Sequence, residues 1–295
     1  MKTFNYINKS FNYLSNEKIN ICLGFFDGIH LGHQKLINTA LKEGSKLGLM
    51  TFFSPFKRED VLTSLEDKKN LLEKMGVDYL FILDFKDVKN YSPEVFINEV
   101  LKPLNINKIY VGRDYSFGKG GIGKVDLLKS YFDVEEVDFA YDKKGNKISS
   151  SSIISYIENG EIEKANRDLN RFYSIKGKVE HGFHNGTSIL EIPTANITPK
   201  EEYVFPKCGV YATNIYIGGI KYPSMTNIGV HPTISKLDRP DIETNIFAMN
   251  RDLYSQDVIL EFVSYIREEK KFDSVDDLVK QIKEDKKIIL KILDK

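Results

Sequence analysis

The sequence predicts an α/β domain followed by a β-rich domain. Over residues 1–170, short apolar runs alternate with amphipathic segments of helical spacing, which favours a parallel sheet with helices on both faces. Over residues 171–295 the segments become short, rich in β-branched and aromatic residues and separated by turn residues, as in an antiparallel sandwich or barrel. A length of 295 residues suits two such domains better than one.

The elements of each domain follow from these patterns. In the first domain we expect strands at 19–26, 47–53, 78–83 and 108–111, with helices at 34–47, 67–75 and 92–100. The last of these helices begins at Ser92–Pro93, because serine caps a helix and proline suits its first position. In the second domain we expect strands at 173–180, 209–217, 220–227, 242–249 and 258–263, and a final helix from about Val275, capped by Ser274.

The composition argues against several classes of partner. Because 42 basic residues balance 42 acidic ones, the sequence predicts no nucleic-acid groove and no affinity for an anionic membrane. No apolar stretch is long enough to span a bilayer, and the first residues lack the apolar run of a signal peptide. Cys22 and Cys208 lie too far apart for a CxxC pair, which disfavours a zinc site or a disulfide framework. We therefore expect a cytoplasmic protein, and the sequence makes no prediction of its oligomeric state.

The segment GFFDGIHLGH at 24–33 lies between the first expected strand and the first expected helix. Ligands of open α/β sheets bind at the carboxyl ends of strands, and a helix N-terminus offers N–H groups to phosphates. Gly28 and Gly32 let the backbone approach a ligand closely, and His30 and His33 can donate hydrogen bonds to phosphate oxygens. The alternative is a glycine-rich turn whose histidines only cap the helix.

This segment resembles the HxGH nucleotidyltransferase superfamily, and within it the bacterial riboflavin kinase and FMN adenylyltransferase family. The segment VGRDYSFG at 111–118 resembles the VGxDFxFG loop of that family, although it could also be a flexible glycine loop. The resemblance implies a Rossmann-like fold, His30 and His33 as catalytic residues, and flavin contacts from Asp114 and Phe117. It also implies nucleotide or phosphate binding by Gly24, Phe26, Asp27, Gly28, Gly32, Ser149, Ser150 and Ser151.

Two positions of this domain depart from the family pattern. Phe56 stands where the family has a histidine, and Ile154 stands where it has an arginine that reaches the ATP phosphates. Loss of such a clamp would cost a few kcal/mol of charge-assisted binding, on the order of 2 to 4. The serines at 149–152 could bind a phosphate in its place, or could only cap a helix over 153–158. The missing charge could come from Lys57, Arg58, Arg113 or Lys119.

The segment PTAN at 193–196 is the first motif of the β-rich domain, where we expect a turn. A threonine hydroxyl and an asparagine carbonyl are oxygen donors that suit Mg²⁺, but the same residues are common in ordinary turns. Together with segments 209–212, 227–233, 241–245, 252–254 and 266–272, the motif resembles the riboflavin kinase domain. That resemblance implies an antiparallel six-stranded β-barrel with a terminal helix.

The same resemblance assigns roles within the barrel. Thr194 and Asn196 would bind Mg²⁺ and ATP phosphates, and Glu243 would accept the proton of the ribityl 5′-hydroxyl as it attacks the γ-phosphate. Without the family pattern, Glu243 would be a solvated strand residue. Asn227 and Arg267 are the implied flavin contacts. Gly182 belongs to the nucleotide flap that the resemblance implies. Glu191 stands in this flap where the family usually has a glycine. The flap also contains His181 and His184, and we expect no metal role for these two histidines or for His231.

The sequence therefore predicts a bifunctional enzyme. Its barrel phosphorylates riboflavin to FMN, and its α/β domain joins FMN to the adenylyl group of ATP, giving FAD and pyrophosphate. Both steps need Mg²⁺, and the substrates are ATP, riboflavin and FMN. We expect direct attack by FMN, because the first site offers no covalent nucleophile. The alternatives are a riboflavin kinase with a degenerate adenylyltransferase domain and a non-catalytic flavin-binding protein.

Overall fold

The computed structural model describes residues 1–13, 17–53, 60–180, 194–229, 240–247, 249 and 253–294. Contacts between Cα atoms divide the chain into two compact units, Met1–Ser150 and Ser151–Lys295. This division groups the helices α6 (Ser150–Glu158) and α7 (Ile162–Leu169) with the second unit. The domain boundary at residue 170, which places both helices in the first domain, stays a prediction.

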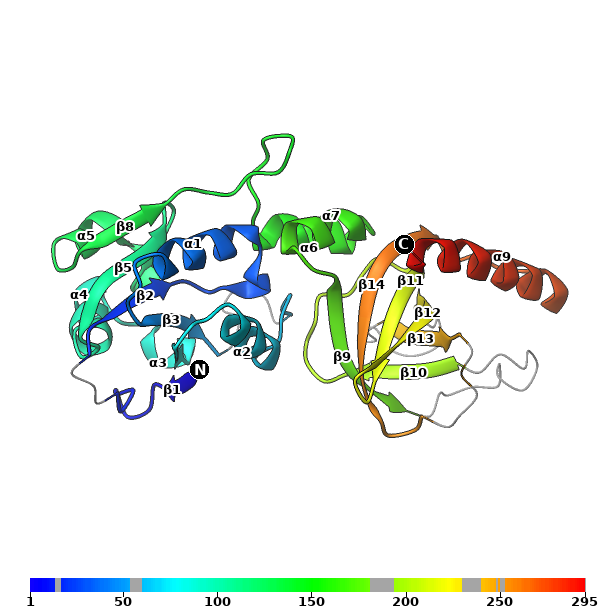
Figure 1. The fold of residues 1–295 in the computed structure, drawn as a ribbon, viewed down its shortest axis with the longest axis horizontal. Helices are drawn as coiled ribbons and strands as arrows, with labels where there is room; N and C mark the ends of the chain where they lie inside the picture. The colour runs from blue at the N-terminus through cyan, green and yellow to red at the C-terminus, as the bar shows by residue number, and fades with distance from the viewer. Residues whose placement is uncertain are drawn as a thin grey trace. The chain divides into compact units, whose positions relative to one another are not determined.

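The first unit is built on a six-stranded sheet in which every pair of neighbouring strands is parallel (Figure 1). Its order is β1-β4-β3-β2-β5-β8, so the predicted parallel sheet is confirmed, with additional strands at both edges. The strands are β1 (Lys2–Asn5), β4 (Tyr79–Leu83), β3 (Leu47–Phe52), β2 (Ile19–Leu23), β5 (Ile106–Gly112) and β8 (Val134–Val137).

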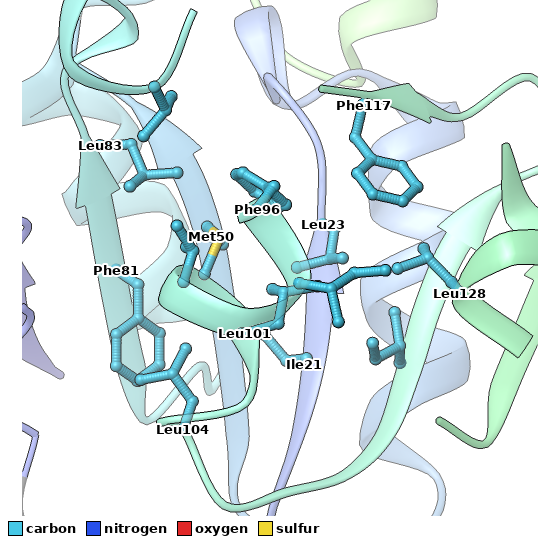
Figure 2. Packing of buried hydrophobic residues seen from close by; sticks show 14 of the residues in the cluster. Ile21, Leu23, Met50, Phe81, Leu83, Phe96, Leu101, Leu104, Phe117 and Leu128 are labelled. Atoms are coloured by element: carbon cyan, nitrogen blue, oxygen red, sulfur yellow. The ribbon is translucent and has the colours of Figure 1, made fainter. Parts of the chain in front are cut away.

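Helices cover both faces of this sheet because its strands alternate between two apolar clusters. Ile21 and Leu23 of β2 belong to one cluster, and Cys22 belongs to the other. The helices α1 (Leu31–Leu41) and α2 (Leu65–Lys74) complete the Cys22 cluster. The opposite cluster is completed by α4 (Pro93–Phe96), the π-helical turn η2 (Ile97–Leu101) and α5 (Val125–Lys129), and Figure 2 shows part of it. The short helix α3 (Phe85–Val88) follows β4.

One helix end differs from its prediction. The helix expected over 34–47 begins at Leu31 and ends at Leu41, and Leu47 is the first residue of β3. Gly44 takes a positive φ of 70°, which a glycine adopts at little cost and which turns the chain out of the helix. The apolar Leu47 matched the helical spacing but packs in the sheet.

The second unit contains a closed antiparallel barrel with the strand order β10-β13-β12-β11-β14-β9. The six-stranded barrel is therefore confirmed. Its strands are β9 (Tyr173–Glu180), β10 (Thr194–Pro199), β11 (Gly209–Ile217), β12 (Ile220–Gly229), β13 (Asp241–Ile246) and β14 (Asp257–Arg267). Gly218 and Gly219 both take positive φ values, 59° and 83°, as a two-residue hairpin turn between β11 and β12 requires.

The terminal helix α9 (Val275–Leu293) begins at the cap residue Ser274, as predicted, and packs beside β11, β12 and β14 (Figure 1). Its Ile289 is fully buried against Ala212 of β11 and Phe247. The predicted turn at 194–196 is wrong, because these residues form the start of β10 and pair with β13. None of the helices in the described ranges is both long and apolar enough to cross a membrane.

Candidate functional sites

The first site lies where the order of the parallel sheet reverses. From β2 the chain continues to β3 on one side, whereas from β5 it continues to β8 on the other. Because β2 and β5 are neighbours, the loops that follow their carboxyl ends lie where open α/β sheets bind their ligands. These loops, 24–30 and 113–118, belong to the segments 24–33 and 111–118 that the sequence analysis selected.

Two stacked histidines occupy the N-terminus of α1. His30 is buried and caps the helix, because its Nδ1 accepts the N–H of Gly32 at 3.1 Å, which places the ring proton on Nε2. The rings of His30 and His33 stack with centroids 3.7 Å apart. Burial, with the neighbouring charges of His30 and Lys68, holds the pKa of His33 well below its usual range. His30 can donate its Nε2–H and a neutral His33 can donate one ring N–H at the N-terminus of α1.

The turn before α1 has an unusual backbone conformation. Phe26 and Ile29 have positive φ values of 53° and 42°, which cost energy for residues with side chains, and Gly28 has a φ of 82°. Both apolar side chains are 1% exposed, so packing holds the backbone in this conformation. Asp27 accepts the N–H groups of Leu62 and Thr63 at 3.0 and 3.3 Å. Burial raises the pKa of Asp27 in spite of these hydrogen bonds and the nearby Lys68.

A buried lysine completes this turn, and the sequence analysis missed it. Lys68 of α2 is 4% exposed, and its Nζ donates to the Phe25 carbonyl at 2.9 Å and to Thr51 Oγ1 at 3.1 Å. Burial lowers the pKa of Lys68 to about 8, although the charge of Asp27 acts in the opposite direction. Its position could have revealed it, because Lys68 follows Leu65 by three residues and precedes Leu72 by four, on the apolar face of the helix.

The serine run at 149–152, although distant in sequence, lies close to the turn before α1. Ser150, the first residue of α6, donates from Oγ to the Asp27 carbonyl at 3.0 Å. A Cβ atom on Gly32 would lie 3.6 Å from the Ile148 carbonyl, so this segment also packs close to the start of α1. Ser149 is half-buried and Ser151 is exposed. The structure thus brings Ser150 to the predicted phosphate site and shows that the run also begins a helix.

The loop after β5 supplies the two residues predicted to contact flavin. Asp114 is mostly exposed and forms an ion pair with Lys147 at 2.5 Å. Phe117 is 6% exposed and its ring centroid lies 5.7 Å from that of Phe96 (Figure 2). The ring of Tyr115 stacks on Phe117 with centroids 6.0 Å apart. Phe117 is therefore part of the apolar core under the loop. Flavin contact by these residues stays a prediction.

The second site is a row of polar side chains across three barrel strands. Asn196 of β10 and Asn227 of β12 both lie directly opposite Glu243 of β13. Directly opposed residues of antiparallel strands point to the same face, with Cβ atoms about 5 Å apart. Ala195 and Thr244, the next residues in register, are buried, so the polar row lies on the outer face of the barrel. Thr194 is exposed two residues before Asn196, on the same face.

Residues near α9 extend this row. Asn227 donates from Nδ2 to Glu269 Oε1 at 3.1 Å, a contact that the sequence analysis missed. Arg267 donates from Nε and Nη2 to Asp285 of α9, with a shortest distance of 2.8 Å, and Asp285 is 1% exposed. Arg267 therefore anchors the terminal helix, and its predicted contact with flavin stays a prediction. Among the described residues, no group of three or more histidines, cysteines or carboxylates could hold a metal ion.

Several predicted residues lie outside the described ranges. In the first domain these are Phe56, Lys57 and Arg58, and in the second they are His181, Gly182, His184, Glu191, Pro193 and His231.

Known proteins match the chain over both units. A family model for FAD synthetase matches residues 13–152, and one for riboflavin kinase matches residues 169–293. The bifunctional riboflavin kinase/FMN adenylyltransferase of Bacillus subtilis (strain 168) is 36% identical over 284 residues, which cover 90% of each chain. The chain belongs to this bifunctional family. The Escherichia coli (strain K12) protein of the same name is 30% identical, again over 90% of each chain.

A solved structure agrees with this family fold. A Streptococcus pneumoniae protein described as a macrolide-efflux protein is 30% identical, with a TM-score of 0.89 over 98% of this chain and 99% of that one. The efflux description applies to the pneumococcal protein. For this chain the comparison adds that the similarity in fold to the pneumococcal protein extends over both units.

One departure from the family pattern, at Ile154, lies within the described residues. Ile154, at the position of the family arginine, is 8% exposed in α6 and packs as an apolar residue. Arg113, one candidate for the missing charge, forms an ion pair with Asp138 at 2.5 Å. Lys119 is exposed in the glycine loop after β6 (Ser116–Phe117). Within the described residues, the buried Lys68 donates directly to a carbonyl of the turn before α1.

Proposed function

We propose that the two domains carry out successive steps of flavin cofactor synthesis. The barrel transfers the γ-phosphoryl group of ATP to the 5′-hydroxyl of riboflavin, giving FMN and ADP. The N-terminal domain then joins FMN to the adenylyl group of a second ATP, giving FAD and pyrophosphate. The main structural support is the register that sets Glu243 between Asn196 and Asn227 on one face of the barrel.

In the kinase step, the Glu243 carboxylate accepts the proton of the 5′-hydroxyl while the oxygen attacks the γ-phosphorus and ADP leaves. Its position supports this role, because the neighbouring amides of Asn196 and Asn227 can orient the carboxylate and its alcohol partner. Asn227 is in turn oriented by its hydrogen bond to Glu269. A flavin that binds beside Asn227 would then present its ribityl chain to Glu243.

The donors on β10 fit a magnesium ion. Thr194 and Asn196 carry neutral oxygens on the same face of the strand, next to the Glu243 carboxylate, and Mg²⁺ prefers such oxygen ligands. When bound, Mg²⁺ would neutralise the charge of the nucleotide phosphates. The protein residues orient the nucleotide, the flavin hydroxyl and the base.

In the adenylyl step, a phosphate oxygen of FMN attacks the α-phosphorus of ATP and pyrophosphate leaves. His30 and His33 stand at the N-terminus of α1, where N–H groups and the helix dipole stabilise the negative charge that develops on the α-phosphate. The bond from Ser150 to the Asp27 carbonyl supports a place for the serine run beside these phosphates. Asp114 and Phe117, in the loop after β5, are the proposed flavin contacts of this site.

The experiment supplies the purified protein first with riboflavin, ATP and Mg²⁺ and then with FMN, ATP and Mg²⁺, and separates the flavins by chromatography. The proposal expects FMN in the first reaction, FAD in both, and neither product when a chelator removes Mg²⁺. Formation of FMN without FAD would limit the protein to the kinase step. Absence of both products would contradict the proposal. We further propose that the enzyme acts on small molecules rather than nucleic acids. We also propose that it is cytoplasmic, and fractionation of cells can test this location.

A further inference from the structure

Lys68 is a buried cation whose hydrogen-bond acceptors are neutral. Its Nζ donates to the Phe25 carbonyl and to Thr51 Oγ1, and in the described part of the chain it forms no ion pair with a carboxylate. Burial of an ammonium group among neutral acceptors is costly even with the charge of Asp27 nearby, so such a residue needs a reason other than stability. The phosphate turn at the mouth of α1 supplies such a reason.

The contacts of Lys68 determine the shape of that turn. The Phe25 carbonyl accepts hydrogen bonds from Lys68 Nζ and from Thr51 Oγ1, the latter at 2.7 Å. Phe26, the next residue, has the left-handed backbone conformation, and the Asp27 carboxylate is bound to N–H groups just before α2. The residues on either side of Phe26 are therefore held, Phe25 from β3 and α2 and Asp27 from the residues just before α2. Among the side chains that donate hydrogen bonds to the Phe25 carbonyl, Lys68 is the one with a positive charge.

The electrostatic surroundings of Lys68 favour the arrival of an anion. Asp27 from the turn stabilises its charge, and His33 from α1 interacts with it, whereas Thr51 from β3 is neutral. One carboxylate does not offset the burial of the ammonium, since the pKa of Lys68 is lowered to about 8. A triphosphate at the N-terminus of α1 would add negative charge nearby and favour the protonated lysine.

We propose that Lys68 is a positioning residue for adenylyl transfer, which fixes the Phe25–Asp27 turn and adds a positive charge beneath the nucleotide phosphates. This inference rests on the proposed adenylyltransferase function of the N-terminal domain. Lys68 acts through the turn and through its charge, without contact to the reacting atoms.

The test compares Lys68→Met with the wild-type enzyme and with Lys74→Met, an exposed lysine of the same helix. FAD formation is measured at saturating FMN over a range of ATP concentrations, and FMN formation from riboflavin is measured in parallel. Lys68→Met is expected to lower kcat/KM for ATP in FAD formation by about 10- to 100-fold. Most of this loss should be a higher KM, because a fixed charge attracts bound ATP and the transition state alike.

The two control measurements are expected to change little. FMN formation should stay within about twofold of wild type in both variants, because the barrel has its own ATP site. The Phe25 carbonyl keeps its hydrogen bond from Thr51 in Lys68→Met, so the thermal unfolding midpoint should not fall. Thr51→Val is a second variant, which removes one acceptor of Lys68 and the Thr51 hydrogen bond to the Phe25 carbonyl but keeps the lysine charge, and it should raise the KM for ATP by a smaller factor.

Several outcomes would overturn the inference. Unchanged FAD kinetics in Lys68→Met would show that the lysine is not needed for the step. An equal loss of both activities together with a lower unfolding midpoint would assign Lys68 a structural role only. If the wild-type enzyme itself made FMN but no FAD, the proposed adenylyltransferase function would fail, and the inference would fail with it.

Discussion

The two sites of this enzyme are built in different ways. The first is a turn at the ends of parallel strands, and it is shaped by residues from α2, β3 and the start of α6. The second is a row of side chains in one register position of three antiparallel strands. The first site thus depends on contacts between distant segments, whereas the second depends on strand pairing.

This difference has consequences for how each site tolerates change. At the turn, buried groups such as Asp27 and Lys68 influence one another's charge, so one substitution affects several residues. In the barrel, each side chain has a place set by the backbone ladder, and a substitution removes one function while its neighbours stay in place. A set of variants can test this contrast, because each domain has its own product.

The largest effect is expected for Glu243→Gln. Glutamine keeps the size of the side chain but cannot accept the proton of the 5′-hydroxyl, so FMN formation should fall by about 10²- to 10⁴-fold. FAD formation from supplied FMN should be unchanged. The matched control is Asp241→Asn, an exposed residue of the same strand, which should keep wild-type kinase activity. Full kinase activity in Glu243→Gln would remove Glu243 from its proposed role.

A loss nearly as large is expected for His33→Asn in the other domain. Removal of one donor at the mouth of α1 should lower kcat for FAD formation by about 10²- to 10³-fold. Asn38→Ala, on the exposed side of the same helix, provides the comparison. Because the barrel is a separate unit, the rate of FMN formation should be unaffected, and a parallel loss of both products would contradict the separation of the two sites.

Asp285→Asn tests the connection between the barrel and α9. The variant leaves Arg267 mostly buried beside a neutral amide, which should lower the free energy of unfolding of the barrel by about 2 to 4 kcal/mol. Urea unfolding followed by circular dichroism measures this change, with the exposed neighbour Glu284→Gln as the control. Equal stability of the two variants would show that the buried ion pair does not anchor the helix.

The smallest effect concerns the pH dependence of stability. The pKa of Lys68 is about 8 in the folded protein and about 10.5 in the unfolded chain, so above pH 8 the unfolded chain binds a proton that the folded protein has released. The unfolding free energy of wild type relative to Lys68→Met should therefore rise with pH. Between about pH 7 and 8.5 the change should be less than about 1 kcal/mol. A constant or falling difference would show that the pKa of Lys68 is not lowered.

Much of the fold could be predicted because its determinants are local. The spacing of apolar residues indicated α1 and α2, and the glycine pair at 218–219 indicated the β11–β12 hairpin. The prediction of a turn at Thr194–Asn196 was wrong because proline, threonine and asparagine are common in turns. These residues form a strand because β13 and β9 offer backbone partners on both sides, which no local pattern shows.

In the candidate sites too, the features set by neighbouring residues could be predicted, and those set by distant contacts could not. The motif around His30 and His33 was visible in the sequence, because a strand, a short glycine-containing turn and a helix follow one another within it. Lys68 was missed because a lysine in an amphipathic helix is normally exposed, and its burial depends on the turn against which α2 packs. Glu269 was missed because nothing in its own segment indicates a contact with Asn227.

The sequence by itself determined the two kinds of domain, most of their central strands and helices, and the motifs on which the proposed chemistry rests. Each of these depends on neighbours within a few residues, through periodicity, capping and turn formation. Only the tertiary structure decided that Ser150 meets Asp27 across 123 positions and that Glu243 stands between Asn196 and Asn227. Such contacts between distant residues depend on strand order and register, which are determined by the packing of the whole domain.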